Sequence, residues 1–397
     1  MGGDSALFPG VTTGIRAMRR RWVIGVCGLL CTVWAHAAVD TVPFTLQRNR
    51  IVIYCHVNKV GPYPFMLDSG LPEIVIADDV AKYAKAKGLP DSTLEMPDSM
   101  GNMIGGDAVQ IDSLKAGAIK LESGRGLAMA LSGYKALIGT PIAGLVDIAR
   151  FGKPVAIDFQ TSQLRVGADI EATAGKYVVP LTYAADGLPV AQGVINGKVA
   201  ADMILDLSYG GTVALPENWA RKQGLVTSDT PRIVFEPSPE NQGAVPDAQC
   251  RVQNLRIGNA TLARPVCDLM PSGDRVRLGI GFLKHFHVTF DPAHKTTRLE
   301  PTGPDMPASP SIIGVGIVLT VRASDLWAVQ VALRSPAAEA DVHSGDLLSR
   351  IGKQSVKDMS YDDVQSKLSM GAGERIDLTF ERDGESHTVT LEAEPLL

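Results

Sequence analysis

The chain is poor in aromatic residues and in cysteine, and it has no surplus of positive charge. Only 6% of its 397 residues are aromatic and 5 are Cys, whereas Gly (40) and Pro (25) are plentiful. This composition is typical of a chain with many turns and short strands. The net charge of −5, without a face rich in Lys and Arg, gives no reason to expect a nucleic-acid partner. The length predicts two or three domains.

Long apolar runs are also scarce. The one at residues 22–34 has 13 residues, and a membrane span needs roughly 20. Three Arg residues precede it at 19–21, and Ala-His-Ala follows it, ending at Ala37. This order predicts a signal peptide over 1–37, cleavage after Ala37, and export to the periplasm or the extracellular space. The alternative is an uncleaved anchor helix. No other stretch is long enough to span a bilayer, so we expect no membrane contact after cleavage.

One pattern occurs twice in the middle of the chain. Asn58 stands ten residues before Asp68 in "FMLDSG", and Asn196 stands ten residues before Asp206 in "MILDLS". Three later pairs of segments correspond in the same order: "SLKAGAIKLES" with "NLRIGNATLAR", "ALIGTPI" with "RLGIGFL", and "VAIDFQTSQLRV" with "VTFDPAHKTTRLE". In the second pair, Gly139 is matched to Gly279. The repeat predicts two related lobes, at 40–172 and 173–300, offset by 138 residues.

Within each lobe, short apolar runs are separated by turn residues such as Asn196-Gly197 and are interrupted by one short helical segment, "ADDVAKYAKAKGL" or "PENWARKQGL". This spacing predicts mainly β, barrel-like lobes. Residues 301–311 contain four Pro and read as a linker. The remaining unit, 312–397, alternates strand and helix patterns and ends in a hairpin that turns at Asp383-Gly384, which predicts an α+β domain.

Matched Asp residues in a duplicated β-lobe resemble the pepsin-like and retropepsin-like aspartic protease families, over most of 43–300. The resemblance implies that Asp68 and Asp206 form a catalytic pair that shares a proton and activates a water, without a cofactor, to hydrolyse a polypeptide substrate. A closer likeness is to exported bacterial proteins that join a retropepsin-like region to a C-terminal PDZ domain. An exported aspartic peptidase is therefore one predicted function.

The two motifs around these Asp residues differ. The family pattern, Asp-Thr/Ser-Gly, is kept at Asp68, Ser69 and Gly70. The second copy has Leu207 and Ser208 after the Asp. In the family, the hydroxyl residue hydrogen-bonds to the opposite loop and holds the carboxylates nearly coplanar. Ser69 has that hydroxyl and Leu207 does not. The alternative function is a peptide-binding or scaffold protein that keeps the lobes without hydrolysis.

Residues 98–109, rich in Gly and Met, are either the flap that covers the substrate in this family or an ordinary loop. The C-terminal unit resembles a PDZ domain, on the segment "SPAAEADVHSGDLLSRIGKQSV". Such domains add a peptide as a strand at a sheet edge and hold its terminal carboxylate with loop amides. The resemblance implies that Gly314, Gly316, Ile317 and Val318 form this loop and strand. The alternative is a domain that packs on the lobes and binds no peptide.

Three Cys residues remain after the predicted cleavage. If "NLRIGNATLAR" is a hairpin turning at Gly258-Asn259, Cys250 lies opposite Cys267. An exported protein permits a disulfide there, and two buried thiols are the alternative. His285 and His287 alternate on a predicted strand. Two ligands without a third do not predict a zinc site, so we expect no metal.

Overall fold

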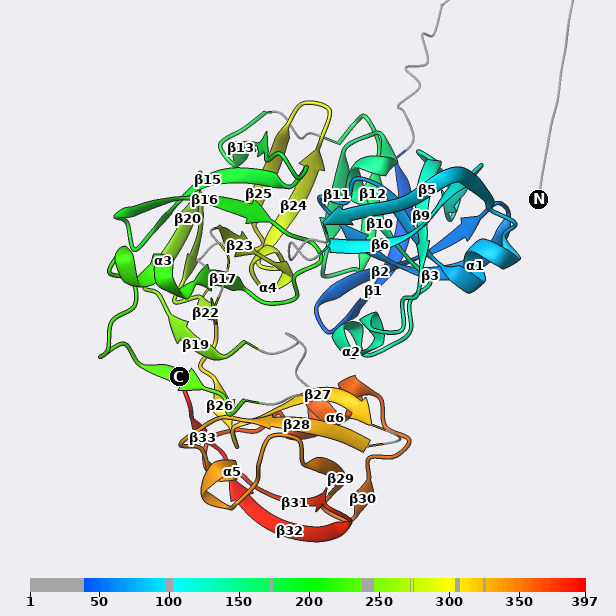
Figure 1. The fold of residues 1–397 in the computed structure, drawn as a ribbon. Coiled ribbons are helices and arrows are strands. Elements are labelled where there is room, and N and C mark those ends of the chain that lie inside the picture. The colour runs from blue at the N-terminus through cyan, green and yellow to red at the C-terminus, as the bar shows by residue number, and fades with distance from the viewer. Residues whose placement is uncertain are drawn as a thin grey trace, which may run out of the picture. The chain divides into compact units, whose positions relative to one another are not determined.

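The computed structural model describes residues 39–97, 103–170, 174–237, 246–271, 273, 275–303, 308–323 and 326–397. The predicted signal peptide, residues 98–102 of the predicted flap and residues 304–307 of the predicted linker lie outside them. Strands dominate (Figure 1), so the mainly β prediction is confirmed. No helix in the described part of the chain is long and apolar enough to cross a membrane.

The first lobe consists of short strands and two short α-helices. Strand β3 (Val60–Asp68) is exposed where it begins and buried where it ends, at Asp68. The elements of this lobe are β1 (Asp40–Gln47), β2 (Arg50–Val57), β3 (Val60–Asp68), β4 (Ile74–Ala77), α1 (Asp78–Tyr83), β5 (Lys87–Pro97), β6 (Met103–Ile111), β7 (Leu114–Ala116), β8 (Ile119–Leu121), β9 (Gly124–Met129), α2 (Tyr134–Ile138), β10 (Gly144–Asp147), the 3₁₀ helix η1 (Ile148–Phe151), β11 (Val155–Asp158) and β12 (Gln163–Val166).

The second lobe contains a related series of strands and short helices. Its Asn196-Gly197 turn joins two strands, as predicted. The elements are β13 (Val178–Pro180), β14 (Thr182–Tyr183), β15 (Pro189–Ile195), β16 (Val199–Leu205), β17 (Val213–Pro216), α3 (Glu217–Lys222), β18 (Arg232–Val234), β19 (Ala248–Arg251), β20 (Asn254–Ile257), β21 (Ala260–Ala263), β22 (Val266–Met270), β23 (Val276–Leu278), α4 (Ile280–Leu283), β24 (Phe286–Asp291) and β25 (Thr296–Pro301).

The strand pairing confirms the duplication. In the first lobe, β3 runs parallel to β10, and β4 pairs antiparallel with β10. In the second lobe, β16 runs parallel to β23, and β17 pairs antiparallel with β23. Both lobes also contain a parallel pair beyond this unit, β4 with β9 and β17 with β22. Each Asp loop therefore begins at the end of a strand that has a parallel neighbour.

The predicted match of Gly139 with Gly279 is wrong. Gly139 ends helix α2 in a left-handed conformation, with φ 87°. The first-lobe counterpart of β23 is β10, in which Asp147 lies opposite Asp68. Since Leu205 lies opposite Leu278 in the second lobe, the residue that corresponds to Gly279 is Asp147. A short apolar-Gly motif occurs at both places in the first lobe, and only the parallel pairing decides between them.

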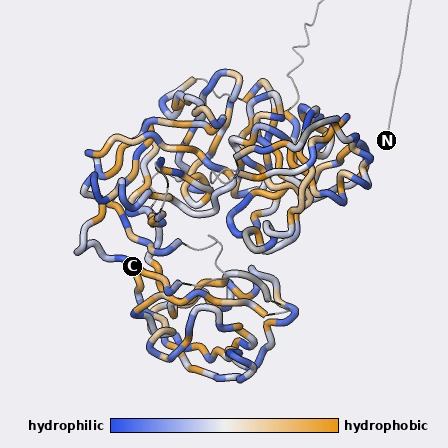
Figure 2. Tube along the Cα trace, in the orientation of Figure 1, coloured by the Kyte–Doolittle hydropathy of each residue, from blue (hydrophilic) through white to orange (hydrophobic). Residues whose placement is uncertain are grey.

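One sheet joins the two lobes. Strand β24 of the second lobe pairs antiparallel with β11 of the first, with Val155 opposite Phe290. The strand order across this junction is β13-β25-β24-β11-β12-β1, and β24 and β11 can be followed side by side in Figure 1. Buried apolar residues of both lobes form one core, and apolar segments recur along the strands of both (Figure 2). The two lobes are therefore joined by one continuous sheet and by one hydrophobic core.

The C-terminal unit is a separate α+β layer with its own core. Gly316, with φ +83°, divides the strand predicted at its start into two strands. Asp341 adopts a left-handed conformation, with φ 61°. The elements are β26 (Ile313–Gly314), β27 (Ile317–Ala323), β28 (Leu326–Val331), α5 (Pro336–Glu339), β29 (Leu347–Ile351), β30 (Gln354–Ser355), α6 (Tyr361–Leu368), β31 (Arg375–Arg382), β32 (Glu385–Glu392) and β33 (Glu394–Pro395).

This unit is attached to the second lobe by main-chain hydrogen bonds. Phe235, just after β18, forms a β-bridge with Ala332, just after β28. The amide of Glu236 donates to the carbonyl of Val331 at 2.8 Å, and the carboxylate of Glu236 accepts from the amide of Ser344 at 2.7 Å. The C-terminal domain and the β18–β19 hairpin therefore share a continuous hydrogen-bonded contact.

The two buried cysteines of the second lobe are in register, as predicted. The hairpin β20–β21 turns at Gly258-Asn259, and Cys250 of β19 lies opposite Cys267 of β22. Both thiols are free in the structure and fully buried. Burial raises the pKa of Cys250 to about 11. The pair is therefore placed for a disulfide without being joined by one.

Oxidative refolding in a glutathione buffer is expected to join Cys250 to Cys267 and to leave Cys55 free. Opposed residues of an antiparallel pair have Cα atoms about 4.5–5.5 Å apart, which lies within the range that a disulfide accepts. Peptide mapping without reduction measures the linkage. Recovery of both thiols as unlinked, alkylated peptides after refolding would show that the strand geometry rejects the bond.

Candidate functional site

The Asp68 loop begins where β3 ends. The carboxylate of Asp68 accepts a hydrogen bond from the amide of Ser69 at 2.6 Å, and 3% of Asp68 and 4% of Ser69 are exposed. Gly70 packs closely against the second lobe. A Cβ at this position would lie 2.2 Å from the side chain of Leu188. The first motif is therefore packed directly against the other lobe, at a position that excludes a side chain.

Ser69 connects the two Asp loops. Its hydroxyl donates to the carbonyl of Leu205 at 2.8 Å and accepts from the amide of Leu207 at 3.0 Å. These residues stand on either side of Asp206, so one side chain holds the second loop before and after its carboxylate. Leu207 is fully buried in the shared core and has no hydroxyl to return the contact. The connection between the loops is thus made by the Ser69 hydroxyl and not by its counterpart.

The carboxylate of Asp206 is occupied on both oxygens. Oδ1 accepts from the amide of Ser208 at 2.9 Å, from the Ser208 hydroxyl at 2.6 Å, and from the amide of Tyr209 at 3.2 Å. Oδ2 pairs with Nη1 of Arg277 at 3.0 Å. Asp206 is 1% exposed. The charge of this carboxylate is therefore balanced by a guanidinium beside it.

This arrangement bears directly on the chemistry expected of two carboxylates. A proton-sharing pair works because two close, unpaired negative charges cannot both persist, so that one group is acid and the other is base. A guanidinium is always protonated and supplies the compensating charge without a proton. Arg277 supplies such a compensating charge to the Asp206 carboxylate.

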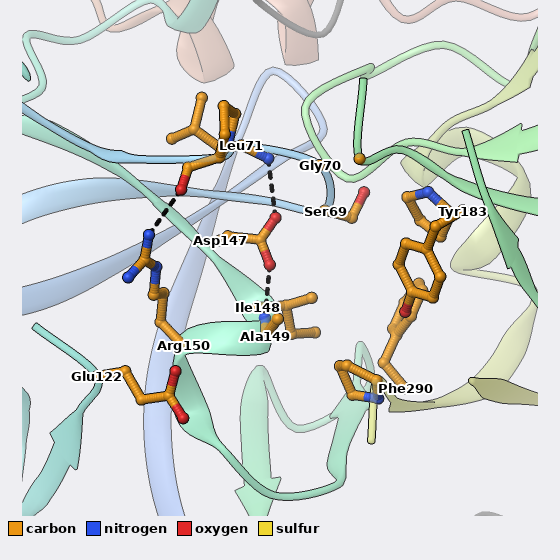
Figure 3. A pocket seen from close by; sticks show the side chains of 14 residues that line it. Ser69, Gly70, Leu71, Glu122, Asp147, Ile148, Ala149, Arg150, Tyr183 and Phe290 are labelled. Carbon is orange, nitrogen blue, oxygen red and sulfur yellow. Dashed lines mark hydrogen bonds between the residues drawn. The ribbon is translucent and has the colours of Figure 1, made fainter. Parts of the chain in front are cut away.

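A third carboxylate lies beside the Asp68 loop. Asp147 ends β10 opposite Asp68, and its oxygens accept from the amides of Leu71 at 2.9 Å and Ala149 at 2.6 Å. Figure 3 shows the Asp147 side chain between these two residues. Burial raises the pKa of Asp147 to about 6, although both amides act to lower it. Asp147 thus fastens the loop that follows Asp68 to η1.

A cavity of about 240 Å³ opens beside Asp147, with walls from both lobes. Ser69 and Arg150 line its first-lobe side, and Tyr183 and Phe290 line the other (Figure 3). Burial raises the pKa of the Tyr183 hydroxyl, and the Asp147 charge adds to the effect. The guanidinium of Arg150 donates to the carbonyl of Pro72 at 2.7 Å. The cavity is therefore polar on its first-lobe side.

The residues of the predicted peptide loop lie in β26, in β27 and between these two strands. Gly316 has φ +83°, and a Cβ there would lie 2.1 Å from the Ser335 side chain, so this position requires Gly. Ile317 and Val318 begin β27, the first strand in the order β27-β28-β29-β31-β32. Among the described residues, the amides of Val315 and Gly316 donate to no main-chain carbonyl. An edge strand and two available amides are what peptide capture requires.

Metal ligands do not gather in the described part of the chain. No group of three or more His, Cys, Asp and Glu side chains there lies close enough to hold an ion. His287 is exposed on β24, and His285 precedes that strand. The site is therefore built from carboxylates, hydroxyls and guanidiniums.

Three residues of the site were not identified from the sequence: Arg277, Asp147 and Arg48. Arg277 interrupts the apolar segment "VRLGIG", where the corresponding residue of β10 is Leu145, and a charge within an apolar strand was a usable signal. Asp147 follows the apolar run "GLV" as Asp68 follows "FML". Arg48, whose guanidinium donates to the carbonyls of Leu319 and Thr320 in the C-terminal domain, carried no such signal.

The comparisons with known proteins identify one domain. Residues 327–382 match the PDZ domain family, which lies within the predicted 312–397 unit. The chain therefore carries a PDZ domain. No curated protein matches the sequence. Among solved structures, the chain is similar to "Crystal structure of Basic 7S globulin from soybean", at 10% identity and a TM-score of 0.43, covering 66% of this chain and 95% of that chain.

Removing one member of the Asp206–Arg277 pair is expected to destabilise the protein by about 3 kcal/mol, because the other charge stays buried without a partner. The double variant Asp206→Asn/Arg277→Met should lose less than the sum of the single variants, with a coupling of about 1–3 kcal/mol. Urea unfolding measures each variant. Arg275→Met serves as a control, since Arg275 pairs with the more exposed Asp186. Additive losses at 206 and 277 would show that the ion pair contributes nothing.

Asp147 is expected to make the protein less stable as pH rises from about 4 to about 6. Its folded-state pKa of about 6 lies above the ordinary 3.8, so the folded state binds the proton more tightly, and this contribution is present below pH 4 and lost above pH 6. Asp147→Asn should remove this slope. Urea midpoints between pH 3.5 and 7 measure it, with Glu122→Gln as a control. An unchanged slope in Asp147→Asn would assign the pH dependence elsewhere.

Proposed function

We propose that this chain is a polypeptide-binding protein whose PDZ domain captures peptides, and whose two lobes do not hydrolyse them by a proton shared between Asp68 and Asp206. One observation carries the proposal: the Asp206 carboxylate is buried, accepts three hydrogen bonds from its own loop, and is paired with Arg277. Both oxygens of this carboxylate therefore already accept hydrogen bonds from the second lobe.

The second motif supports this proposal. Water-mediated hydrolysis requires both carboxylates in a fixed orientation toward one water, and a displacement of about 1 Å can cost roughly 100-fold in rate. Leu207 supplies no hydroxyl, and the hydroxyl of Ser208 is turned back to Asp206 itself. The second loop is thus stabilised by contacts within itself, together with the Ser69 hydroxyl.

The PDZ domain supports the peptide-binding part. Its family match, the edge strand β27 and the amides of Val315 and Gly316 combine the features by which such domains add a peptide strand and hold a terminal carboxylate. The ligand class is therefore a peptide with a free C-terminus. Export, as the N-terminal segment predicts, would place this binding in the periplasm or the extracellular space.

Aspartic peptidase activity is the second candidate, and the contact made by Ser69 favours it. Asp68, Ser69 and Gly70 keep the family motif. The Ser69 hydroxyl hydrogen-bonds to Leu205 and Leu207 in the opposite loop, as the family pattern requires. In this alternative, Arg277 would have to leave Asp206 before the pair could act.

Incubation with a peptide library from pH 2.5 to 8, followed by mass spectrometry, separates the two candidates. We expect no cleavage by the parent chain. The variant Leu207→Thr/Ser208→Gly/Arg277→Leu restores the family motif and releases Asp206, so it should gain cleavage that disappears on adding Asp68→Asn. Circular dichroism checks that each variant is folded. Cleavage by the parent that is lost in both Asp68→Asn and Asp206→Asn would overturn the proposal in favour of the peptidase.

A further inference from the structure

The turn between β1 and β2 reaches from the first lobe to the PDZ domain. Arg48 and Asn49 adopt left-handed conformations there, with φ 48° and 56°, and the turn directs the Arg48 side chain to β27. Nη2 of Arg48 donates to the carbonyls of Leu319 at 2.9 Å and Thr320 at 2.8 Å. The pairing of β27 with β28 shifts register between Leu319 and Arg322, so two successive carbonyls of an edge strand accept from one guanidinium.

The same guanidinium lies against aromatic rings of the PDZ domain. Its Cζ is 4.1 Å from the ring centroid of Tyr361, the first residue of α6, and 5.8 Å from that of Trp327. Both distances are within the range of a cation–π contact. Burial lowers the pKa of Arg48, while Tyr361 and Asp362 act in the opposite direction. Two carbonyls, a ring face and a nearby carboxylate together form an environment that suits a guanidinium.

This environment lies where a peptide would bind. A peptide that adds to the edge of β27 uses the main-chain groups of that strand, and the carbonyls of Leu319 and Thr320 follow directly after the Ile317 and Val318 positions of the predicted loop and strand. The first lobe also lies close to Tyr361. A Cβ placed on Gly139, which follows α2, would lie 3.5 Å from the Cβ of Tyr361. Arg48 and an incoming peptide would therefore compete for the same acceptors.

The other side of the turn holds the Asp206 loop. The side-chain amide of Asn49 donates to the carbonyl of Gly210 at 3.1 Å, and Nε of Arg50 donates to the carbonyl of Ser208 at 3.0 Å. Arg50 also donates through Nη1 to the carbonyl of Arg48 at 2.9 Å. One short turn thus contacts the PDZ edge with its first residue and the second Asp loop with the next two.

We propose that the carbonyls of Leu319 and Thr320 and the ring of Tyr361 form a guanidinium subsite of the PDZ domain, which Arg48 fills in the free protein. A peptide that carries Arg at the position facing this subsite binds by displacing Arg48. The partner is therefore an arginine-containing peptide with a free C-terminus. This inference rests on the proposed peptide-binding function. It specifies that the peptide is selected by an Arg side chain and that Arg48 is the residue displaced.

A competition experiment tests the subsite. The probes are a random decapeptide pool with Arg fixed at one of the last five positions and a free C-terminal carboxylate, and a matched pool with citrulline in its place, which keeps the shape and removes the charge. Binding of the full chain is measured by fluorescence polarisation. Arg48→Met should bind the best Arg pool at least about tenfold more tightly than the parent, and Arg165→Met, an exposed Arg of the same lobe, should not. Adding Tyr361→Leu to Arg48→Met should remove most of the gain, and the citrulline pools should gain less than the Arg pools.

The outcomes separate this inference from the function on which it rests. If the parent and Arg48→Met bind the Arg pools equally, or if Arg48→Met binds the citrulline pools as tightly as the Arg pools, peptide binding stands and the guanidinium subsite is overturned. If no variant binds any pool, the proposed peptide-binding function fails, and this inference fails with it. Should Arg48→Met not fold, Tyr361→Leu in the parent background gives a second test. It should lower the affinity for the Arg pools relative to the citrulline pools, and an unchanged ratio of the two affinities would contradict the subsite.

Discussion

The ion pair between Arg277 and Asp206 holds the second Asp loop and sets the charge around its carboxylate. A buried carboxylate requires a compensating charge or a proton, and the choice between them decides whether two lobes of this kind can perform acid–base chemistry. Here the charge comes from a strand residue of the same lobe, one position before the residue whose carbonyl accepts from the Asp206 amide. The Asp206 carboxylate is thereby held by contacts from within its own lobe.

Around this pair, the two lobes divide their roles. The first lobe provides the Ser69 hydroxyl, which holds the second Asp loop from across the interface, and the turn at Arg48, which reaches the PDZ edge. The second lobe provides the β18 hairpin, to which the PDZ domain is attached through Phe235 and Glu236. Contacts near the Asp loops and contacts with the PDZ domain thus share one turn.

The sequence was sufficient for the features that local rules determine. Turn residues at Asn196-Gly197 and Gly258-Asn259 placed the hairpins, and the period of two along the strands placed Cys250 opposite Cys267. The repeat placed both Asp loops. The sequence was not sufficient to predict contacts between a side chain and a residue distant in the chain. Arg277, Asp147 and Arg48 act through such contacts, and the apolar-Gly motif at Gly139 was misassigned because only strand pairing distinguishes it from β10.

The most direct test of the central claim is an X-ray structure at about 1.2 Å, a resolution at which hydrogen positions begin to appear. Crystals at about pH 4 suit the comparison, because a pepsin-type pair still shares its proton there. The account predicts Nη1 of Arg277 within hydrogen-bond distance of Oδ2 of Asp206, and no water bridging the carboxylates of Asp68 and Asp206. A water held between both carboxylates, with Arg277 directed away, would contradict it.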